Sequence, residues 1–254
     1  MRIDEIIYGV LALLLIIIIL LFAAHFYILY KDNSNRKGIE VTSIAENTNC
    51  SINENVVLRE TKDKGEEYIK KLYFVGDSTT YHFYKGGIDM SHILVPSSLT
   101  LTLNSNINNV EVGNTSLTIS QALKEANAEI VILTLGINGA NTFTENKYKT
   151  YYNKLIEDIK ATSPNTKIIL QSIFPVTKSF DNYNKGISNK CIDKLNMWTK
   201  EIAFEQNIKY LDTQSILKDE NGSQYEHYNV QDGIHMNAEA YKAILYYIRT
   251  HAIE

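Results

Sequence analysis

The sequence predicts an α/β domain, built as a doubly wound parallel sheet with helices on both faces and preceded by one transmembrane helix. Two observations predict the domain: short, continuously apolar segments recur along the chain, and amphipathic helical patterns separate them. A third observation, a long apolar run near the N-terminus, predicts the membrane-spanning helix. The chain has 254 residues, which suits one such domain and an appendage.

Five apolar segments are predicted to be strands. Continuous runs of Ile, Leu and Val are typical of strands buried on both faces, as in parallel sheets. The run at 129–135 is the clearest, and the run at 167–172 is nearly as clear. The predicted strands cover residues 72–75, 93–95, 129–135, 167–172 and 208–211.

Helices are predicted between these strands and after the last one. The first is short and covers 120–126, and the second ends at 163–165. The last begins after Asn237, a residue type favoured as an N-cap. The inward faces of the three longer helices comprise, in order, Tyr148, Tyr152, Leu155, Ile156 and Ile159; Ile192, Leu195, Trp198, Ile202 and Ala203; and Tyr241, Ile244, Leu245 and Ile248.

Residues 1–30 are predicted to form the transmembrane anchor. Between residues 6 and 30 the only strongly polar side chain is His25, and a spanning helix needs roughly 20 apolar residues. A cleaved signal peptide has a shorter apolar core, and a buried core helix normally has a polar face, so both alternatives are disfavoured. Residues 31–69 are polar and predict a linker, which leaves 70–254 as the folded domain.

The orientation of the anchor follows less directly from the sequence. Arg2 precedes the apolar run, whereas Lys31, Arg36 and Lys37 follow it, and this local charge favours a cytoplasmic domain. Short N-terminal anchors ahead of long domains nonetheless often translocate the domain. We therefore expect a single-pass protein of the cell membrane with an extracytoplasmic domain.

Composition excludes several classes of function. The net charge of −4 and the pI of about 5.9 argue against a nucleic-acid-binding protein. The two cysteines, Cys50 and Cys191, have no metal-ligand spacing and define no disulfide framework. The sequence thus predicts neither a metal nor a cofactor. The expected partners are an acylated substrate, small or carbohydrate, and the membrane.

Three polar clusters follow predicted strands or precede the last helix, at 76–79, 136–139 and 232–235. Ligands of doubly wound sheets bind at the carboxyl ends of the strands, where these clusters are expected. Ser78 would begin a helix, His235 can act as its base, and Asp232 can orient the imidazole. Asn138 can donate its side-chain N–H to the oxyanion of a tetrahedral intermediate.

The order Gly-Asp-Ser, Gly-x-Asn and Asp-x-x-His resembles the SGNH hydrolases, also called the GDSL family, from about residue 71 to 252. The resemblance implies a three-layer α/β/α fold like that of flavodoxin and a serine esterase mechanism without metal or cofactor. It also implies the roles of the residues. Ser78 is the nucleophile and donates its backbone N–H to the oxyanion, Asn138 is a second donor, and Asp232 and His235 complete the triad.

The sequence departs from the family pattern in two places. The third block usually reads Gly-x-Asn-Asp, but here Gly139 follows the asparagine. The second block should offer a glycine as a backbone oxyanion donor, whereas residues 96–98 read Pro-Ser-Ser. Ser98 is the predicted donor in its place, with Gly113 as the other candidate.

Each motif also has a structural explanation when taken alone. Ser78 could cap a helix, Asn138 could stabilise a turn, and His235 could be an ordinary loop histidine. Their joint occurrence favours the catalytic interpretation, while Asp77 is expected only to support its turn. Aromatic residues near the motifs are interpreted mainly as packing residues, with a sugar-binding cleft as the alternative: Tyr81, Phe83, Tyr84, Tyr225 and Tyr228.

The predicted function is hydrolysis of an O-acyl ester, with O-acetyl as the expected group, on a cell-envelope carbohydrate. Two alternatives remain open. An O-acyltransferase acting on surface glycan would use the same acyl-enzyme, and an inactive SGNH-like module would only bind glycan. Fold and family alone do not determine the substrate.

Overall fold

The structure is a computed structural model that describes residues 56–96, 110–183 and 186–253. The predicted anchor at 1–30, most of the predicted linker, and Ser98 lie outside the described residues. Within the described part of the chain, no helix is long and apolar enough to cross a membrane.

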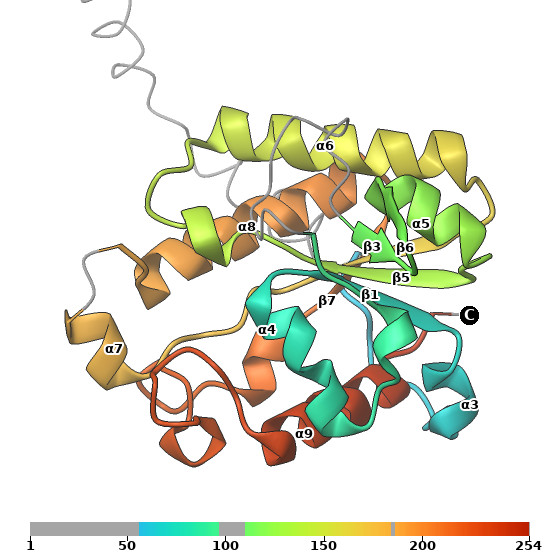
Figure 1. The fold of residues 1–254 in the computed structure, drawn as a ribbon. Coiled ribbons are helices and arrows are strands. Elements are labelled where there is room, and N and C mark those ends of the chain that lie inside the picture. Colours follow the sequence, from blue (N-terminus) through green and yellow to red (C-terminus); the bar gives the residue numbers. More distant parts are fainter. Residues whose placement is uncertain (1–55, 97–109, 184–185, 254) are drawn as a thin grey trace, which may run out of the picture. The chain divides into compact units, whose positions relative to one another are not determined.

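A five-stranded, fully parallel sheet forms the centre of the fold, in the order β2-β1-β5-β6-β7 (Figure 1). This is the order of flavodoxin-like doubly wound sheets, so the predicted α/β class with a parallel central sheet is confirmed. The predicted transmembrane helix is not part of this confirmation. All five predicted strands are present: β1 (Leu72–Gly76), β2 (Ile93–Leu94), β5 (Ile130–Thr134), β6 (Lys167–Gln171) and β7 (Lys209–Leu211).

Helices cover both faces of the sheet and make three layers (Figure 1). One face packs against α5 (Ile119–Glu125), α6 (Glu145–Thr162) and α8 (Asn189–Glu205). The other face packs against α3 (Gly65–Ile69), α4 (Ser78–Tyr81) and α9 (Ala238–Thr250). The remaining helical turns are α7 (Lys178–Tyr183) and the 3-10 helices η2 (His82–Gly86), η3 (Met90–His92), η4 (Ile137–Gly139), η5 (Thr213–Ile216) and η6 (Glu226–Tyr228).

Each of the three long helices begins after a polar residue whose side chain caps it. The side chains of Thr144 and Ser188 accept backbone N–H groups in the first turns of α6 and α8. Asn237 does the same for Ala240 in α9, as predicted. The predicted inward faces are buried, except that Leu155 is only partly buried. Their burial against the sheet, more than helix propensity, stabilises these helices.

Two elements were not predicted. The hairpin of β3 (Val110–Val112) and β4 (Thr115–Leu117) turns at Gly113, whose φ of +60° suits glycine. Gly113 therefore occupies a hairpin turn, and the turn accounts for its positive φ. Helix α7 has no buried residue and so no apolar face for the pattern to reveal.

Part of the predicted linker contacts the sheet. Leu58 donates its N–H to the carbonyl of Tyr210 at 2.8 Å, and Val57 forms a parallel bridge with the same residue on β7. Asp63 forms an ion pair with Arg249 of α9. The domain boundary at residue 70 stays a prediction, but residues 56–69 already take part in these contacts.

The pairing of β1 with β5 brings two of the polar clusters together. Gly76 lies opposite Thr134, so the segments that follow the two strands leave the sheet at the same level. A Cβ atom on Gly76 would lie 1.9 Å from Thr80 Oγ1 and 2.4 Å from the Thr134 carbonyl oxygen. Glycine is therefore required for the strand to turn into α4 beside β5.

We expect Gly76→Ala to lower the free energy of unfolding by at least about 3 kcal/mol, the upper end of typical overpacking penalties, because a backbone carbonyl cannot move aside. Gly86→Ala is the matched control, since its Cβ would first meet the flexible end of Leu245 at 2.8 Å. Urea unfolding of both variants measures the difference. An equal or larger loss in Gly86→Ala would contradict the explanation.

Candidate active site

Ser78 is the first residue of α4, immediately after the turn that ends β1. Asp77 caps this helix, and its Oδ1 atom accepts the backbone N–H of Thr79 at 3.0 Å and the Thr79 hydroxyl at 2.8 Å. Tyr241 of α9 donates its hydroxyl to the carbonyl of Thr79 at 2.5 Å. Both residues thus fix Thr79, which follows the half-buried Ser78 at the carboxyl edge of the sheet.

Ser78, His235 and Asp232 form one continuous hydrogen-bonded chain. His235 Nδ1 lies 2.6 Å from Asp232 Oδ2, and His235 Nε2 lies 3.0 Å from Ser78 Oγ. An ionised carboxylate can only accept, so Nδ1 carries the proton and Nε2 is left to accept the serine hydroxyl. This is the tautomer that a base needs in order to take a proton from the serine.

The carboxylate of Asp232 is held in its charged form. Partial burial works to raise the pKa of Asp232, but hydrogen bonds from the backbone N–H of Ile234 and from His235 outweigh it and keep that pKa below its usual range. The two backbone N–H groups lie 2.9 and 2.8 Å from Asp232 Oδ1. Asp232 is therefore ionised at neutral pH and can stabilise a protonated His235.

The side-chain amides of Asn229 and Gln224, together called the amide bracket, hold the loop that carries His235. Asn229 Oδ1 accepts the N–H of Gly233 at 2.9 Å, and Asn229 Nδ2 donates to the carbonyl of His235 at 3.0 Å. Gln224 donates to the carbonyl of Ile234 at 3.3 Å and accepts from Asn229 at 2.6 Å. The two amide side chains thus hold the backbone of Gly233, Ile234 and His235, and this fixes the point from which the imidazole extends.

Asn138 lies on η4, just beyond the end of β5, and its side chain is exposed. The backbone N–H of Ile137 donates a hydrogen bond to Asp77, which ties η4 directly to the turn before Ser78. Asp77 therefore does more than support its own turn, because it links the first and third polar clusters. Gly113 is part of the hairpin and is not placed in the site, and Ser98 lies outside the described residues.

Residues 74–243 match the model of the GDSL-like Lipase/Acylhydrolase family. The chain belongs to this family. It is accordingly a serine hydrolase that acts on carboxylic esters. A search of curated proteins found no match.

Solved structures share the fold of this GDSL-like acylhydrolase at low sequence identity. One is described as a platelet activating factor from Streptococcus pneumonia. It is 18% identical with a TM-score of 0.51, and the match covers 80% of this chain and 97% of that protein's chain. A GDSL-like lipase from Bacteroides thetaiotaomicron is 16% identical with a TM-score of 0.50, covering 74% and 90%. Est24, a carbohydrate acetylesterase from Sinorhizobium meliloti, is 18% identical with a TM-score of 0.47, covering 70% and 95%.

The departure from the family pattern at Gly139 has a steric explanation. A Cβ atom at this position would lie 2.4 Å from the ring of Phe143, which is buried against the same turn. An aspartate in this acylhydrolase would displace that ring. Asn138 lies next to this glycine on η4.

His82 is a neighbour of the triad that the sequence analysis left without a role. Its ring lies 4.9 Å from the ring of His235, in a T-shaped arrangement. Both ring nitrogens of His82 are buried and have no hydrogen-bond partner among the described residues. Burial, helped by Lys85 and His235, lowers the pKa of His82 to about 4, so this ring is neutral at pH 7. Its spacing of four residues from Ser78 is the signal that places it there.

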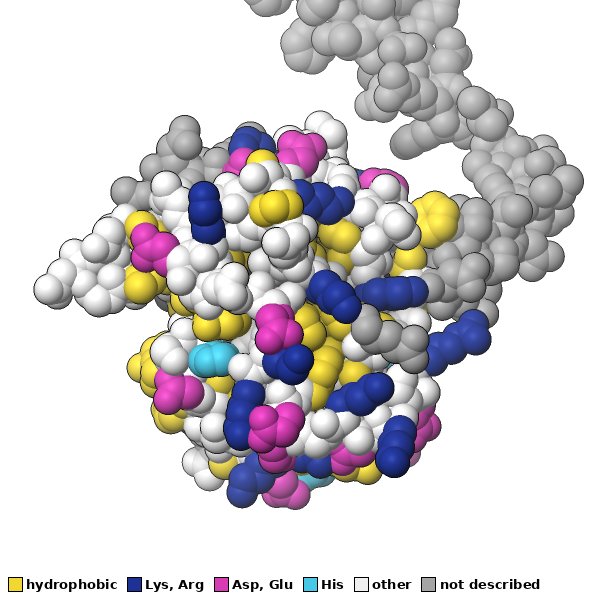
Figure 2. All heavy atoms as spheres, turned by 90° about the vertical axis from the view of Figure 1, so that its right-hand side faces the viewer, with side chains coloured by type: hydrophobic (Ala, Val, Ile, Leu, Met, Phe, Trp, Pro, Cys, Tyr) yellow, Lys and Arg dark blue, Asp and Glu magenta, His cyan; other side chains and the backbone are white. Residues whose placement is uncertain are grey.

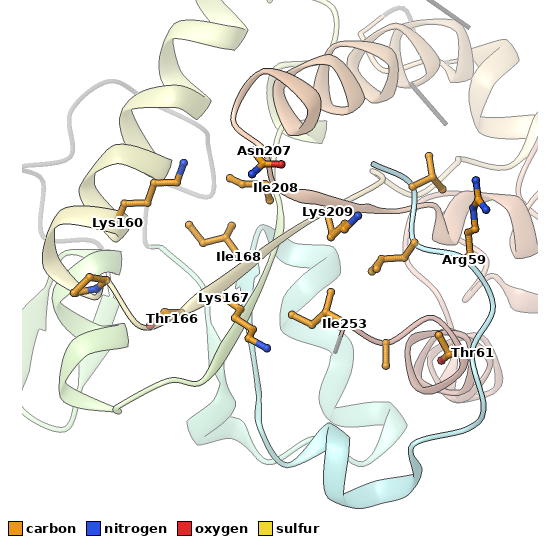
Figure 3. A pocket seen from close by; sticks show the side chains of 14 residues that line it. Arg59, Thr61, Lys160, Thr166, Lys167, Ile168, Asn207, Ile208, Lys209 and Ile253 are labelled. Atoms are coloured by element: carbon orange, nitrogen blue, oxygen red, sulfur yellow. The ribbon is translucent and has the colours of Figure 1, made fainter. Parts of the chain in front are cut away.

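A separate hollow of about 790 Å³ lies at the opposite edge of the sheet, where β6 and β7 begin. Figure 2 shows basic side chains around apolar surface on this face, and Figure 3 shows Lys160, Lys167, Lys209 and Arg59 around the hollow. Because Ser78 follows the carboxyl end of β1, the hollow is not part of the site. Within 56–96, 110–183 and 186–253, no group of His, Cys, Asp and Glu is arranged to hold a metal ion.

The buried carboxylate of Asp77 predicts a pH-dependent stability. Burial raises its pKa from 3.8 to about 6, against the hydrogen bonds from Thr79. The folded state then holds an extra proton between about pH 4 and 6, so this group makes the fold less stable as the pH rises through that range.

We expect Asp77→Asn to gain stability relative to the wild type between pH 4 and pH 7, by on the order of 3 kcal/mol. Urea unfolding at both pH values measures the change. Asp89→Asn is the matched control, because the exposed Asp89 caps η3 in the same way but its hydrogen bonds from Ser91 lower its pKa. The stability of Asp89→Asn relative to the wild type should instead fall between pH 4 and pH 7. A pH-independent difference for Asp77→Asn would refute the burial argument.

The amide bracket predicts a kinetic effect. We expect Asn229→Ala to lower kcat for p-nitrophenyl acetate about 10- to 100-fold, with a smaller change in KM, because a misplaced base loses alignment with the serine. The pH profile of kcat should shift as well, since the base changes its surroundings. Asn146→Ala, at an exposed position of α6, is the control. Loss of activity in step with loss of folded protein would mean that Asn229 is only structural.

Proposed function

We propose that Ser78, His235 and Asp232 are the catalytic triad of this esterase. The continuous chain of hydrogen bonds from Asp232 through His235 to Ser78, at 2.6 and 3.0 Å, is the observation that carries the proposal. Distances of this length permit proton transfer without a rearrangement of the three side chains.

The proposed reaction proceeds through an acyl-enzyme. Ser78 Oγ attacks the ester carbonyl while its proton passes to Nε2 of His235, and Asp232 stabilises the imidazolium. The tetrahedral intermediate collapses, and His235 returns the proton to the oxygen of the departing alcohol. Water then attacks the acyl group with His235 as base, which releases the carboxylic acid and restores the Ser78 hydroxyl.

We assign the oxyanion to donors at the carboxyl edge of the sheet. They are the backbone N–H of Ser78 and the side-chain amide of Asn138. The backbone N–H of Ser98, the third donor that the sequence predicts, lies outside the described residues. Support comes from the link between Asp77 and Ile137, which holds η4 beside the nucleophile turn. Each such donor typically lowers the barrier by about 3 to 4 kcal/mol.

The proposed substrate is an O-acyl ester, with O-acetyl favoured, on a carbohydrate of the cell envelope. The apolar run at 6–30 supports a membrane anchor, and an anchored enzyme with an extracytoplasmic domain would meet such polymers at the cell surface. Anchoring and orientation are tested separately, by alkali extraction of membranes and by protease access to the domain in intact cells.

The triad is tested with the full chain in a non-ionic detergent. We expect Ser78→Ala to lower kcat/KM for p-nitrophenyl acetate at least about 1,000-fold, because no other group replaces the nucleophile. A fluorophosphonate probe should label Ser78 in the wild type, as located by peptide mass spectrometry. Ser91→Ala, on the exposed η3 turn, is the matched control. Undiminished hydrolysis by Ser78→Ala would remove the assignment.

A further inference from the structure

Two large aromatic side chains beside the triad are left exposed. Tyr81 is 44% exposed and Tyr84 is 43% exposed, and their rings meet edge to face with centroids 5.6 Å apart. Phe83, between them in sequence, is fully buried and packs against Phe74 and Tyr241. Phe83 therefore provides the packing of this segment, and the two tyrosines do not contribute to the core.

A continuous series of rings joins this tyrosine pair to the catalytic base. Tyr81 lies 5.6 Å from His82, and His82 lies 4.9 Å from His235, measured between ring centroids. Tyr84 lies 5.9 Å from His82 as well. Because Tyr81 and His82 follow Ser78 by three and four residues, they share the face of the helical segment on which the nucleophile lies.

The charged groups next to the pair already have hydrogen-bond partners. His82 is neutral at pH 7, and Asp232 is engaged by His235 and by two backbone N–H groups. The ammonium group of Lys85 donates to the carbonyl of Met236 at 3.3 Å. Tyrosine combines an apolar ring with a hydroxyl at its edge, which suits a ligand with apolar C–H faces and a rim of hydroxyl groups. A sugar ring has this chemistry.

The proposed mechanism also determines which part of the substrate lies here. His235 must return its proton to the alcohol oxygen of the ester, so the alcohol moiety has to lie next to this imidazole. The rings of His82, Tyr81 and Tyr84 extend from the same imidazole. An acyl chain, by contrast, is held on the other side of the carbonyl carbon.

We propose that Tyr81 and Tyr84 form a carbohydrate subsite that binds the sugar carrying the scissile ester, an inference that rests on the proposed esterase function. The exposed rings stack on the apolar face of the sugar, and the hydroxyl groups of the two tyrosines bond its hydroxyls. The subsite selects a carbohydrate alcohol and leaves the acyl group to the other side of Ser78.

The test compares two kinds of acetate ester on the full-length enzyme in non-ionic detergent. One is a panel of O-acetylated gluco- and xylo-oligosaccharides, and the other is ethyl acetate, whose alcohol has no ring to stack. We expect Tyr81→Ala combined with Tyr84→Ala to lower the ratio of kcat/KM for the best oligosaccharide ester to that for ethyl acetate at least tenfold. Most of this change should appear in KM for the sugar ester.

Controls separate stacking from general damage. Tyr246→Ala on α9 removes another exposed tyrosine, 59% exposed and packed on Arg249, and should leave the ratio unchanged. Replacement of both subsite tyrosines by phenylalanine should keep most of the ratio, because the rings remain. An unchanged ratio in the double alanine variant would overturn the proposal. So would a selective loss on ethyl octanoate, which would assign the tyrosines to the acyl chain.

A direct binding measurement distinguishes failure of the subsite from failure of the esterase assignment. Binding of the deacetylated oligosaccharides is followed by ligand-observed NMR with the Ser78→Ala variant, with and without the two tyrosines. Loss of the ligand signal on removal of the tyrosines supports the subsite even if hydrolysis proves independent of Ser78. No oligosaccharide binding by Ser78→Ala, together with normal hydrolysis of ethyl acetate by the wild type, rejects the subsite alone.

Discussion

The parallel pairing of β1 with β5 is the constraint on which the site depends. It places Gly76 opposite Thr134, so the nucleophile turn and the η4 turn begin side by side. A side chain on Gly76 would strike the Thr134 carbonyl, and the Asp77 carboxylate bridges the narrow space by capping α4 and bonding Ile137. The close approach of two strand ends thus determines where the half-buried Ser78 and Asn138 leave the sheet.

His235, the proposed base, is held by a different kind of interaction. The loop from Asn229 to Asn237 lies outside the sheet, and paired amides and backbone groups hold it in addition to the buried side chain of Met236. Asn229 bonds the backbone of Gly233 and of His235, Gln224 bonds the carbonyl of Ile234, and the two amides bond each other. Gly233 adopts a φ of +84° against the ring of Phe180. Hydrogen bonds are directional, so this loop holds the imidazole in one orientation where exposed apolar contacts would allow several.

The features that could be predicted from the sequence are those encoded by a few neighbouring residues. Strands β5 and β6 are continuous apolar runs, and the cap Asn237 is a residue type with a preferred position in a helix. Ser78, Asp232 and His235 could be predicted as site residues because their motif spans only a few residues at each place. The hydrogen bonds between them join residues 157 positions apart, which only the fold reveals.

Other features have no such signal. An asparagine at 229 or a glutamine at 224 is an ordinary loop residue until its partners are known, and a histidine at 82 is ordinary until His235 is packed against it. Helix α7 and the hairpin around Gly113 are short and largely exposed, so hydrophobic periodicity cannot reveal them. The burial of Asp77 likewise depends on elements that are distant in sequence.

The hydroxyl of Tyr241 on α9, which bonds the backbone of α4, has a consequence for biosynthesis. Ser78 precedes His235 by 157 positions and precedes α9 as well, so it leaves the ribosome before both. A nascent chain can form β1 and β5 before it can bond α4 to Tyr241 or supply His235 to the serine. Because contacts between distant residues close slowly, hydrolytic activity should lag behind helix formation during refolding. The serine is thus without its proposed base until the segment that carries His235 has been made.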